Sequence, residues 1–185
     1  EMLTGVTNGS GSMYEMSASG AAMDKLVVDF LLQKCSFGES ANGILTSGGS
    51  LGNLTALLAA RQAMSGYDAW EEGVGSADDL AVMVSRESHY SVSRAVKIMG
   101  LGEKGMVKIP TQDDFRVDTS KLEKTYQQAL KDGKKIIAVV GSACSTSTGS
   151  FDDLEALADF CKKHGLWLHV DAAHGGGLLL SEKYK

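Results

Sequence analysis

The sequence is poor in several features that each mark a class of protein. It has one proline against 22 glycines, so its loops depend on glycine, as expected where backbone must approach a ligand closely. No run of Lys or Arg stands out, and 18 basic against 23 acidic residues give a net charge of −5. These figures do not favour a nucleic-acid binder or a protein of anionic membranes. The apolar stretches are also far too short for a membrane span.

Cysteine is scarce, with only Cys35, Cys144 and Cys161, an odd number at wide spacing. They form no CxxC pair and no Cys/His zinc pattern, so we expect reduced thiols and a cytoplasmic location. No secretory signal peptide, with its basic segment before an apolar one, opens the chain. Both ends are expected to be cuts through a longer protein.

The 185 residues, 43% hydrophobic and 22% charged, indicate one soluble globular domain with a sizeable core. Short β-rich runs alternate with segments of helical periodicity. This alternation predicts an α/β fold, a three-layer αβα arrangement with a mostly parallel sheet. Strands are expected at 43–46, 80–84, 106–109, 135–140 and 166–170, and helices at 21–36, 51–64, 90–99, 120–131 and 153–164.

Two of these helices carry capping signals at their starts. Ser120-x-x-Glu123 is predicted to be a capping box, and Asp152-x-x-Glu155 is predicted to cap the following helix. Gly165 is predicted to end that second helix.

The first candidate site is the glycine-rich segment 46–53, expected between a strand and a helix. Glycines let the backbone approach an anion, the helix start favours negative charge, and Ser50 adds a hydroxyl. The segment suits a phosphate group, and an ordinary turn with a serine cap fits it equally well. Residues 48–52 also match G-x-S-x-G, the nucleophile elbow of α/β-hydrolases. For that alternative the later Asp171 and His174 come in the right order but only three residues apart.

The second candidate is Asp171, which directly follows an apolar strand and precedes Ala172 and Ala173. An acid there can contact a buried cationic group of a flat ligand, and the alanines leave space for a ring. Capping of the following turn is the alternative. No metal site is predicted, because His169, Asp171 and His174 lack the HExxH type of spacing.

Two further polar segments follow predicted strands. His89 is suited to stacking on a planar ring or to acid/base work, although a lone loop histidine is more often bonded to backbone. Residues 142–149 form a hydroxyl-rich loop that could hydrogen-bond a ligand. Since ligands bind beyond the carboxyl ends of parallel strands, all four motifs are expected to line one crevice. Together they would fit a phosphorylated, aromatic, basic cofactor.

With these motifs in this order, the chain resembles the group II pyridoxal-phosphate-dependent decarboxylases, which act on glutamate, cysteine sulfinate, aromatic amino acids or diaminobutyrate. The resemblance is carried by residues 8–17, 43–50, Asn53, Ala60-Arg61 and 169–173. It implies a fold-type-I transferase-like large domain, with residues 1–185 as one partial domain. It also implies pyridoxal phosphate as cofactor, an amino acid as substrate, decarboxylation as the reaction and a homodimer as the assembly.

The resemblance gives a role to residues of each motif. Gly49 and Ser50 would hold the cofactor phosphate, and His89 would stack on the pyridine ring. Thr146 would lie by the 3′ oxygen of the cofactor and the substrate.

Asp171 would pair with the pyridine nitrogen, and Ala173 would pack on the opposite face of the ring. A carboxylate at that nitrogen keeps the ring protonated, so that the ring accepts the electrons left when carbon dioxide departs. His174 departs from the family, which usually has an aromatic residue there. The Schiff-base lysine of the family is expected beyond Lys185, together with the C-terminal small domain, so the chain alone is expected to be inactive. An aminotransferase or lyase with the same cofactor, a serine hydrolase and a non-catalytic fragment remain as alternatives.

Overall fold

The structure is a computed structural model that describes residues 14–75 and 79–184. It divides into two compact units, residues 47–177 and residues 1–46 with 178–185. Of the segments that carry the resemblance, residues 8–13 lie outside the described part. The prediction that the chain forms one partial domain stays a prediction.

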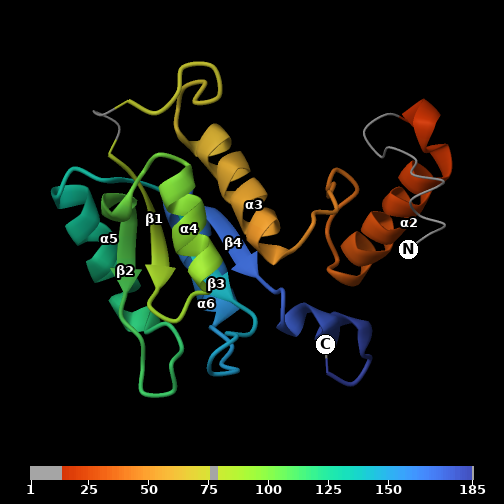
Figure 1. Ribbon diagram of the computed structural model, residues 1–185. Helices are drawn as coiled ribbons and strands as arrows, with labels where there is room; N and C mark the ends of the chain where they lie inside the picture. Colours follow the sequence, from red (N-terminus) through yellow and green to blue (C-terminus); the bar gives the residue numbers. More distant parts are fainter. Residues whose placement is uncertain (1–13, 76–78, 185) are drawn as a thin grey trace. The chain divides into compact units, whose positions relative to one another are not determined.

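Four strands of the larger unit form a parallel sheet in the order β2-β1-β3-β4 (Figure 1). Their bounds are β1 Leu80–Ser85, β2 Met106–Ile109, β3 Lys135–Ser142 and β4 Trp167–Asp171. All three pairings are parallel. The register sets Val82 opposite Met106 and Ser142 opposite Asp171. The predicted parallel sheet is therefore confirmed, and β3 runs two residues further than expected.

Helices cover both faces of this sheet, as Figure 1 shows. The helices are α3 Gly49–Met64, α4 Tyr90–Ile98, α5 Leu122–Lys131 and α6 Leu154–His164. Successive residues of β1 point to opposite faces: Val82 packs in the cluster with α3 and α4, and Met83 packs in the cluster with α5 and α6. Both side chains are fully buried, as a strand between two helical layers requires. The three-layer αβα arrangement is thus confirmed within the larger unit.

The strand expected at 43–46 is wrong. Residues 41–46 have no regular secondary structure, and Ile44 is 73% exposed. A short apolar run becomes a strand only when a neighbour completes its hydrogen bonds, and among the described residues no strand is paired with this run. The glycine-rich segment therefore leads into α3 from a loop. A nucleophile elbow, which needs a strand at that point, loses its structural context.

The capping box predicted at the start of α5 is also wrong. Asp118 accepts hydrogen bonds from Ser120 N (3.1 Å) and Ser120 Oγ (2.6 Å), so the serine is held by the preceding turn. Glu123 reaches across to α6, where it pairs with Lys163 at 2.9 Å. The acid that could have capped the helix is therefore engaged by a cation.

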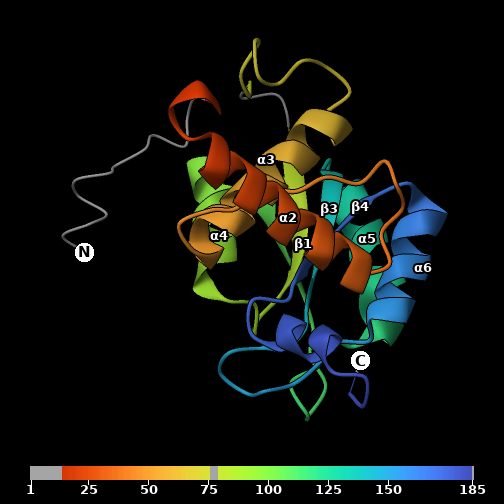
Figure 2. The same ribbon diagram turned by 90° about the vertical axis from the view of Figure 1, so that its right-hand side faces the viewer.

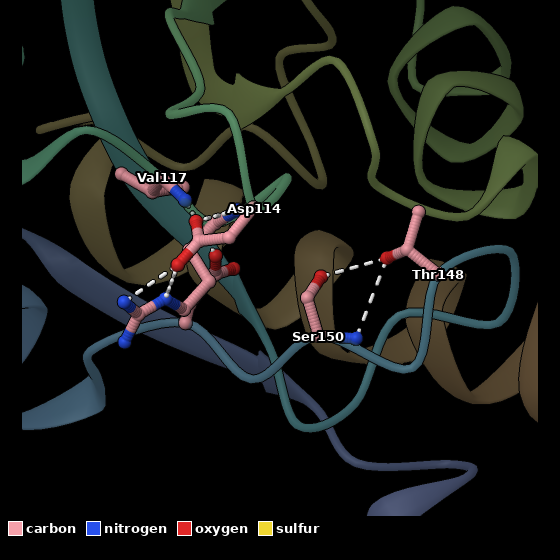
Figure 3. A network of polar contacts seen from close by, with 6 residues as sticks. Asp114, Val117, Thr148 and Ser150 are labelled. Atoms are coloured by element: carbon pink, nitrogen blue, oxygen red, sulfur yellow. Dashed lines mark hydrogen bonds and ion pairs between the residues drawn. The ribbon is translucent and has the colours of Figure 1, made fainter.

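The cap of α6 lies one residue later than predicted. Asp153 is the N-cap and accepts from Ala156 N at 3.0 Å. Asp152 is buried instead, and its two carboxylate oxygens accept from Val117 N and Ser142 N, each at 2.8 Å. Figure 3 shows Val117 in this network, close to the loop after β3. The end of α6 at Gly165, with a φ of +63°, is as predicted.

The smaller unit contains α2, Ala18–Lys34, preceded by the short turn η1, Tyr14–Met16 (Figure 2). The helix starts three residues earlier than predicted and buries none of its residues. Met23 and Leu26 are 64% and 68% exposed. A short 3-10 helix, η4, spans Gly175–Leu180, and the division between the two units falls within it, after Gly177. In the described residues, no helix combines the length and the apolar character that crossing a membrane requires.

Candidate functional site

A cavity of about 230 Å³ opens at the carboxyl end of the parallel sheet, inside the larger unit. Its lining comes from the start of α3, the start of α4, the loop after β3 and the segment after β4. The lining residues are Gly49, Ser50, Asn53, His89, Ser91, Cys144, Thr146, Asp171, Ala173 and His174. The set contains all six residues to which the resemblance gives a cofactor role, so the four motifs line one cavity as expected.

The start of α3 forms the glycine-rich wall. Gly48 has a φ of +132°, a conformation that side chains disfavour, and precedes the helix. Its carbonyl oxygen accepts from Leu51 N and Gly52 N, both at 3.1 Å. The amides of Gly49 and Ser50 therefore precede the first hydrogen bonds of the helix, which is where an anion binds. A Cβ on Gly49 would contact the Cβ of Ala173 at 3.6 Å, so a larger side chain would take space from the cavity.

The Asp171 carboxylate lies at the last residue of β4 and is half-buried. Its Oδ2 accepts from Asn53 Nδ2 at 2.9 Å, and its Oδ1 accepts from Ala173 N at 3.2 Å. The turn-capping alternative is thus realised in the same residue, and one hydrogen bond from a buried amide is added to it. Asn53 is 6% exposed and is the buried polar residue of α3.

His89 is the N-cap residue of α4, at the end of the short turn that follows β1. Its Nδ1 accepts from Ser91 N at 3.3 Å and lies 2.7 Å from Ser91 Oγ. The imidazole also contacts the ring of Tyr90, with centroids 4.2 Å apart and planes inclined by 45°. The ring is therefore fixed at one nitrogen while another part of it lines the cavity.

His169, on the same strand as Asp171, supports the site from behind. Its Nε2 lies 2.8 Å from Asn53 Oδ1. Burial lowers the pKa of His169 below its usual 6.5, and the negative charge of Asp171 only partly opposes this. His169 is therefore neutral near neutral pH.

The loop after β3 supplies Thr146 and Cys144 to the cavity. Thr146 is exposed. Internal bonds hold the loop: Ser145 N donates to Ser150 O at 2.8 Å, and Thr148 Oγ1 lies 2.7 Å from Ser150 Oγ (Figure 3). The hydroxyl groups of the loop thus serve first to shape it, and Thr146 is left beside the ligand space.

A larger cavity of about 550 Å³ borders His89 from another direction. Charged side chains of α4 and β2, including Lys97 and Lys108, line it, and Glu103 pairs with Lys97 at 2.8 Å. It contains neither the helix start at Gly49 nor Asp171, so the smaller cavity is the better candidate for the predicted cofactor.

The serine hydrolase alternative finds no triad in the described residues. His174 lines the cavity, yet no hydrogen bond joins it to Asp171 or to Ser50 there. The described residues also contain no group of three His, Cys, Asp or Glu side chains placed to hold a metal ion. Sequence reasoning missed the contacts of Ser91 and Asn53. Asn53 belongs to the glycine-rich segment 46–53, but its hydrogen-bond partners lie 38 to 118 residues away in the sequence.

Comparisons with known proteins agree with the family resemblance of the sequence. Residues 1–185 match the family described as the pyridoxal-dependent decarboxylase conserved domain. The chain is 31% identical over 198 residues to L-2,4-diaminobutyrate decarboxylase of Acinetobacter baumannii, covering 100% of this chain and 39% of that protein. It is 32% identical over 185 residues to glutamate decarboxylase of Drosophila melanogaster, covering 100% of this chain and 36% of that protein.

Solved structures agree with the fold. The glutamate decarboxylase domain of the Vibrio parahaemolyticus diaminobutyrate-pyruvate transaminase and L-2,4-diaminobutyrate decarboxylase is 34% identical, with a TM-score of 0.91. The match covers 98% of this chain and 40% of that one. Mouse CSAD is 32% identical, with a TM-score of 0.93, covering 100% and 38%. The predicted fold class is confirmed, and the chain spans about two fifths of the length of these relatives.

Proposed function

Since the chain belongs to the pyridoxal-dependent decarboxylase family, we propose that the protein containing it removes the carboxyl group of an amino acid, with pyridoxal phosphate as cofactor. One observation carries the proposal: a phosphate cradle, a carboxylate, an imidazole and a hydroxyl line a single cavity. The activity is proposed for the longer protein, because the chain spans 39% and 36% of the two curated relatives above.

The phosphate would be bound by the amides of Gly49 and Ser50 and by the Ser50 hydroxyl. These amides lie at the positive end of the α3 dipole, ahead of the first helical hydrogen bonds. The absence of a side chain on Gly49 keeps the space between this turn and Ala173 open. The residues present therefore fit a phosphate group.

The ring would be held by Asp171 at its nitrogen, with His89 on one face and Ala173 on the other. Bound pyridoxal phosphate supplies a protonated pyridine ring that accepts electrons when a carboxyl group leaves. Asp171 would hold the proton at the ring nitrogen by charge and hydrogen bonding. Its orientation is fixed by Asn53 Nδ2 at 2.9 Å, so the carboxylate needs little reorganisation.

Thr146 would contact the 3′ oxygen of the cofactor and the substrate from the loop after β3. The internal bonds of that loop leave this hydroxyl at the cavity wall. A homodimer and a cytoplasmic location belong to the same proposal. The three unpaired cysteines support a reducing compartment.

The direct test is reconstitution of the full-length protein with pyridoxal phosphate, followed by a screen for carbon dioxide release. The panel would contain L-2,4-diaminobutyrate, glutamate, aspartate and aromatic amino acids, which are named in the relatives. We expect a visible absorption band and turnover of at least one amino acid. Amino transfer without carbon dioxide would support the aminotransferase alternative. Ester hydrolysis without any cofactor band would contradict the proposal.

A further inference from the structure

A continuous run of side-chain hydrogen bonds passes behind the cavity from β4 to the start of α4. At its centre, Asn53 Oδ1 lies 2.8 Å from His169 Nε2. Asn53 Nδ2 donates to Asp171 Oδ2 at 2.9 Å and to Ser91 Oγ at 2.8 Å. Ser91 Oγ lies 2.7 Å from His89 Nδ1. One buried amide therefore connects the carboxylate of the cavity with its imidazole.

The chemistry of the groups fixes the direction of the bonds around Asn53. An ionised carboxylate only accepts, so the NH₂ of Asn53 must face Asp171. The carbonyl oxygen of Asn53 then faces His169, and this oxygen only accepts. The proton of the neutral His169 must therefore be on Nε2. A flipped amide would bring its oxygen against the carboxylate oxygen, without a proton between them.

The same logic continues through Ser91 to His89. The second N–H of the Asn53 amide points at Ser91 Oγ, so the proton of this hydroxyl is available for His89 Nδ1. The backbone N–H of Ser91 also donates to Nδ1, at 3.3 Å. A nitrogen that accepts from a backbone N–H carries no proton, so the Ser91 hydroxyl must be the donor in its contact with Nδ1, and the proton of the imidazole is on Nε2.

Burial makes this order of protons stable. Ser91 is 1% exposed and Asn53 is 6% exposed, so solvent has little access to their polar atoms. The members come from α3, α4 and β4, and the packing of these elements on the sheet sets their spacing. Asn53 and Ser91 line the wall of the cavity but bear neither the charge nor the ring that would face a cofactor.

We propose that Asn53 and Ser91 are positioning residues that set His89 as the neutral tautomer with its proton on Nε2 and hold Asp171 as a pure acceptor. His89 then presents an N–H, and no basic lone pair, on the nitrogen away from Ser91. The inference rests on the proposed function only for what His89 and Asp171 contact. The tautomer itself is a property of the protein without cofactor.

The test is nitrogen-15 NMR of the full-length protein with histidine-selective labelling, near neutral pH and freed of cofactor. The variant His89→Gln identifies the His89 signals by their loss. We expect an unprotonated Nδ1 and a protonated Nε2. Ser91→Ala removes the hydroxyl donor and should change the single tautomer into a mixture. Asn53→Ala should do the same for His169 and loosen the order at His89.

The matched control is Ser93→Ala on the same helix, whose hydroxyl donates to Tyr90 O at 2.9 Å outside the run. This variant should keep the parental His89 signals. A parental His89 with its proton on Nδ1, or on both nitrogens, would overturn the inference without any variant. So would a single Nε2–H tautomer that persists in both Ser91→Ala and Asn53→Ala. If Asn53→Ala does not fold, a single Nε2–H tautomer that persists in Ser91→Ala is enough to overturn the inference. Failure to bind pyridoxal phosphate would refute the proposed function and leave these cofactor-free spectra unchanged.

Discussion

Two clusters on opposite faces of the sheet combine a histidine with a carboxylate, and their surroundings differ. Behind the cavity, Asn53 separates His169 from Asp171 and is almost fully buried. Between α5 and α6, His164 Nε2 lies 3.0 Å from Glu123 Oε2, and the Glu123 side chain is 46% exposed. The first cluster has directional bonds around a buried amide, whereas the second is screened by solvent. A histidine and a carboxylate are thus held in fixed positions at the cavity, whereas the same residue types form an exposed surface pair between α5 and α6.

The largest expected effect is on turnover. Asp171→Asn in the full-length protein should lower the rate of decarboxylation by about 10²-fold or more, because a neutral amide cannot hold a proton on the ring nitrogen. Glu123→Gln is the matched control on the opposite face and should keep the parental rate. Steady-state assays of both variants, with bound cofactor measured by absorbance, check this. A near-parental rate for Asp171→Asn would remove the distinction between the two clusters.

The next effect concerns stability. Asn53→Ala should lower the free energy of unfolding by about 1–3 kcal/mol, because it leaves buried partners without their hydrogen bonds. Gln127→Ala removes an exposed amide that donates to Glu123 at 3.0 Å, and it should change stability by less than about 0.5 kcal/mol. Denaturant unfolding of both variants measures the contrast. Equal losses would show that burial does not separate the clusters.

Ser50→Ala separates ligand binding from stability at the cavity itself. Ser50 is exposed at the start of α3, so its removal should leave the unfolding midpoint unchanged. The free energy of binding pyridoxal phosphate should become less favourable by about 1–3 kcal/mol, because one hydrogen bond to a charged group is lost. Fluorescence titration with the cofactor gives the affinity. An unchanged affinity would mean that the hydroxyl does not reach the phosphate.

The smallest effect belongs to the exposed cluster and depends on pH. Hydrogen bonds from Lys163, then from Gln127 and His164, lower the pKa of Glu123 from 4.5 to about 2. A lowered folded-state pKa gives stability that is present above pH 4.5 and lost as the pH falls towards 2. The difference in unfolding free energy between the parent and Glu123→Gln should therefore shrink across this range. A difference that stays constant from pH 5 to pH 2 would contradict the assigned ion pair.

The sequence predicted what depends on periodicity and on the order of motifs. Val82 and Met83 lie in a continuous apolar run, and such a run indicates a strand covered on both faces. The position of Asp171 at the end of an apolar strand indicated that it lies at the carboxyl end of the sheet, where ligands bind. The prediction of a strand at 43–46 was wrong, because a strand forms only beside a partner strand and the apolar pattern does not show whether one is present.

Contacts between distant residues could not be read from the sequence. Glu123 has the spacing of a capping box, but Lys163 binds it from 40 residues away. Asp152 satisfies two backbone amides that lie on separate segments. The link from Asn53 to Asp171 spans 118 residues and exists only because α3 packs against the sheet beside β4. Such bonds follow from the tertiary packing.

The contact proposed between Asp171 and the nitrogen of a bound pyridine ring can be observed at the ring nitrogen itself. Nitrogen-15 NMR of the full-length protein, reconstituted with ring-labelled pyridoxal phosphate, tests this contact directly. We expect a protonated ring nitrogen near neutral pH in the parent and an unprotonated one in Asp171→Asn. An unprotonated nitrogen in the parent, or a protonated one in both proteins, would contradict it.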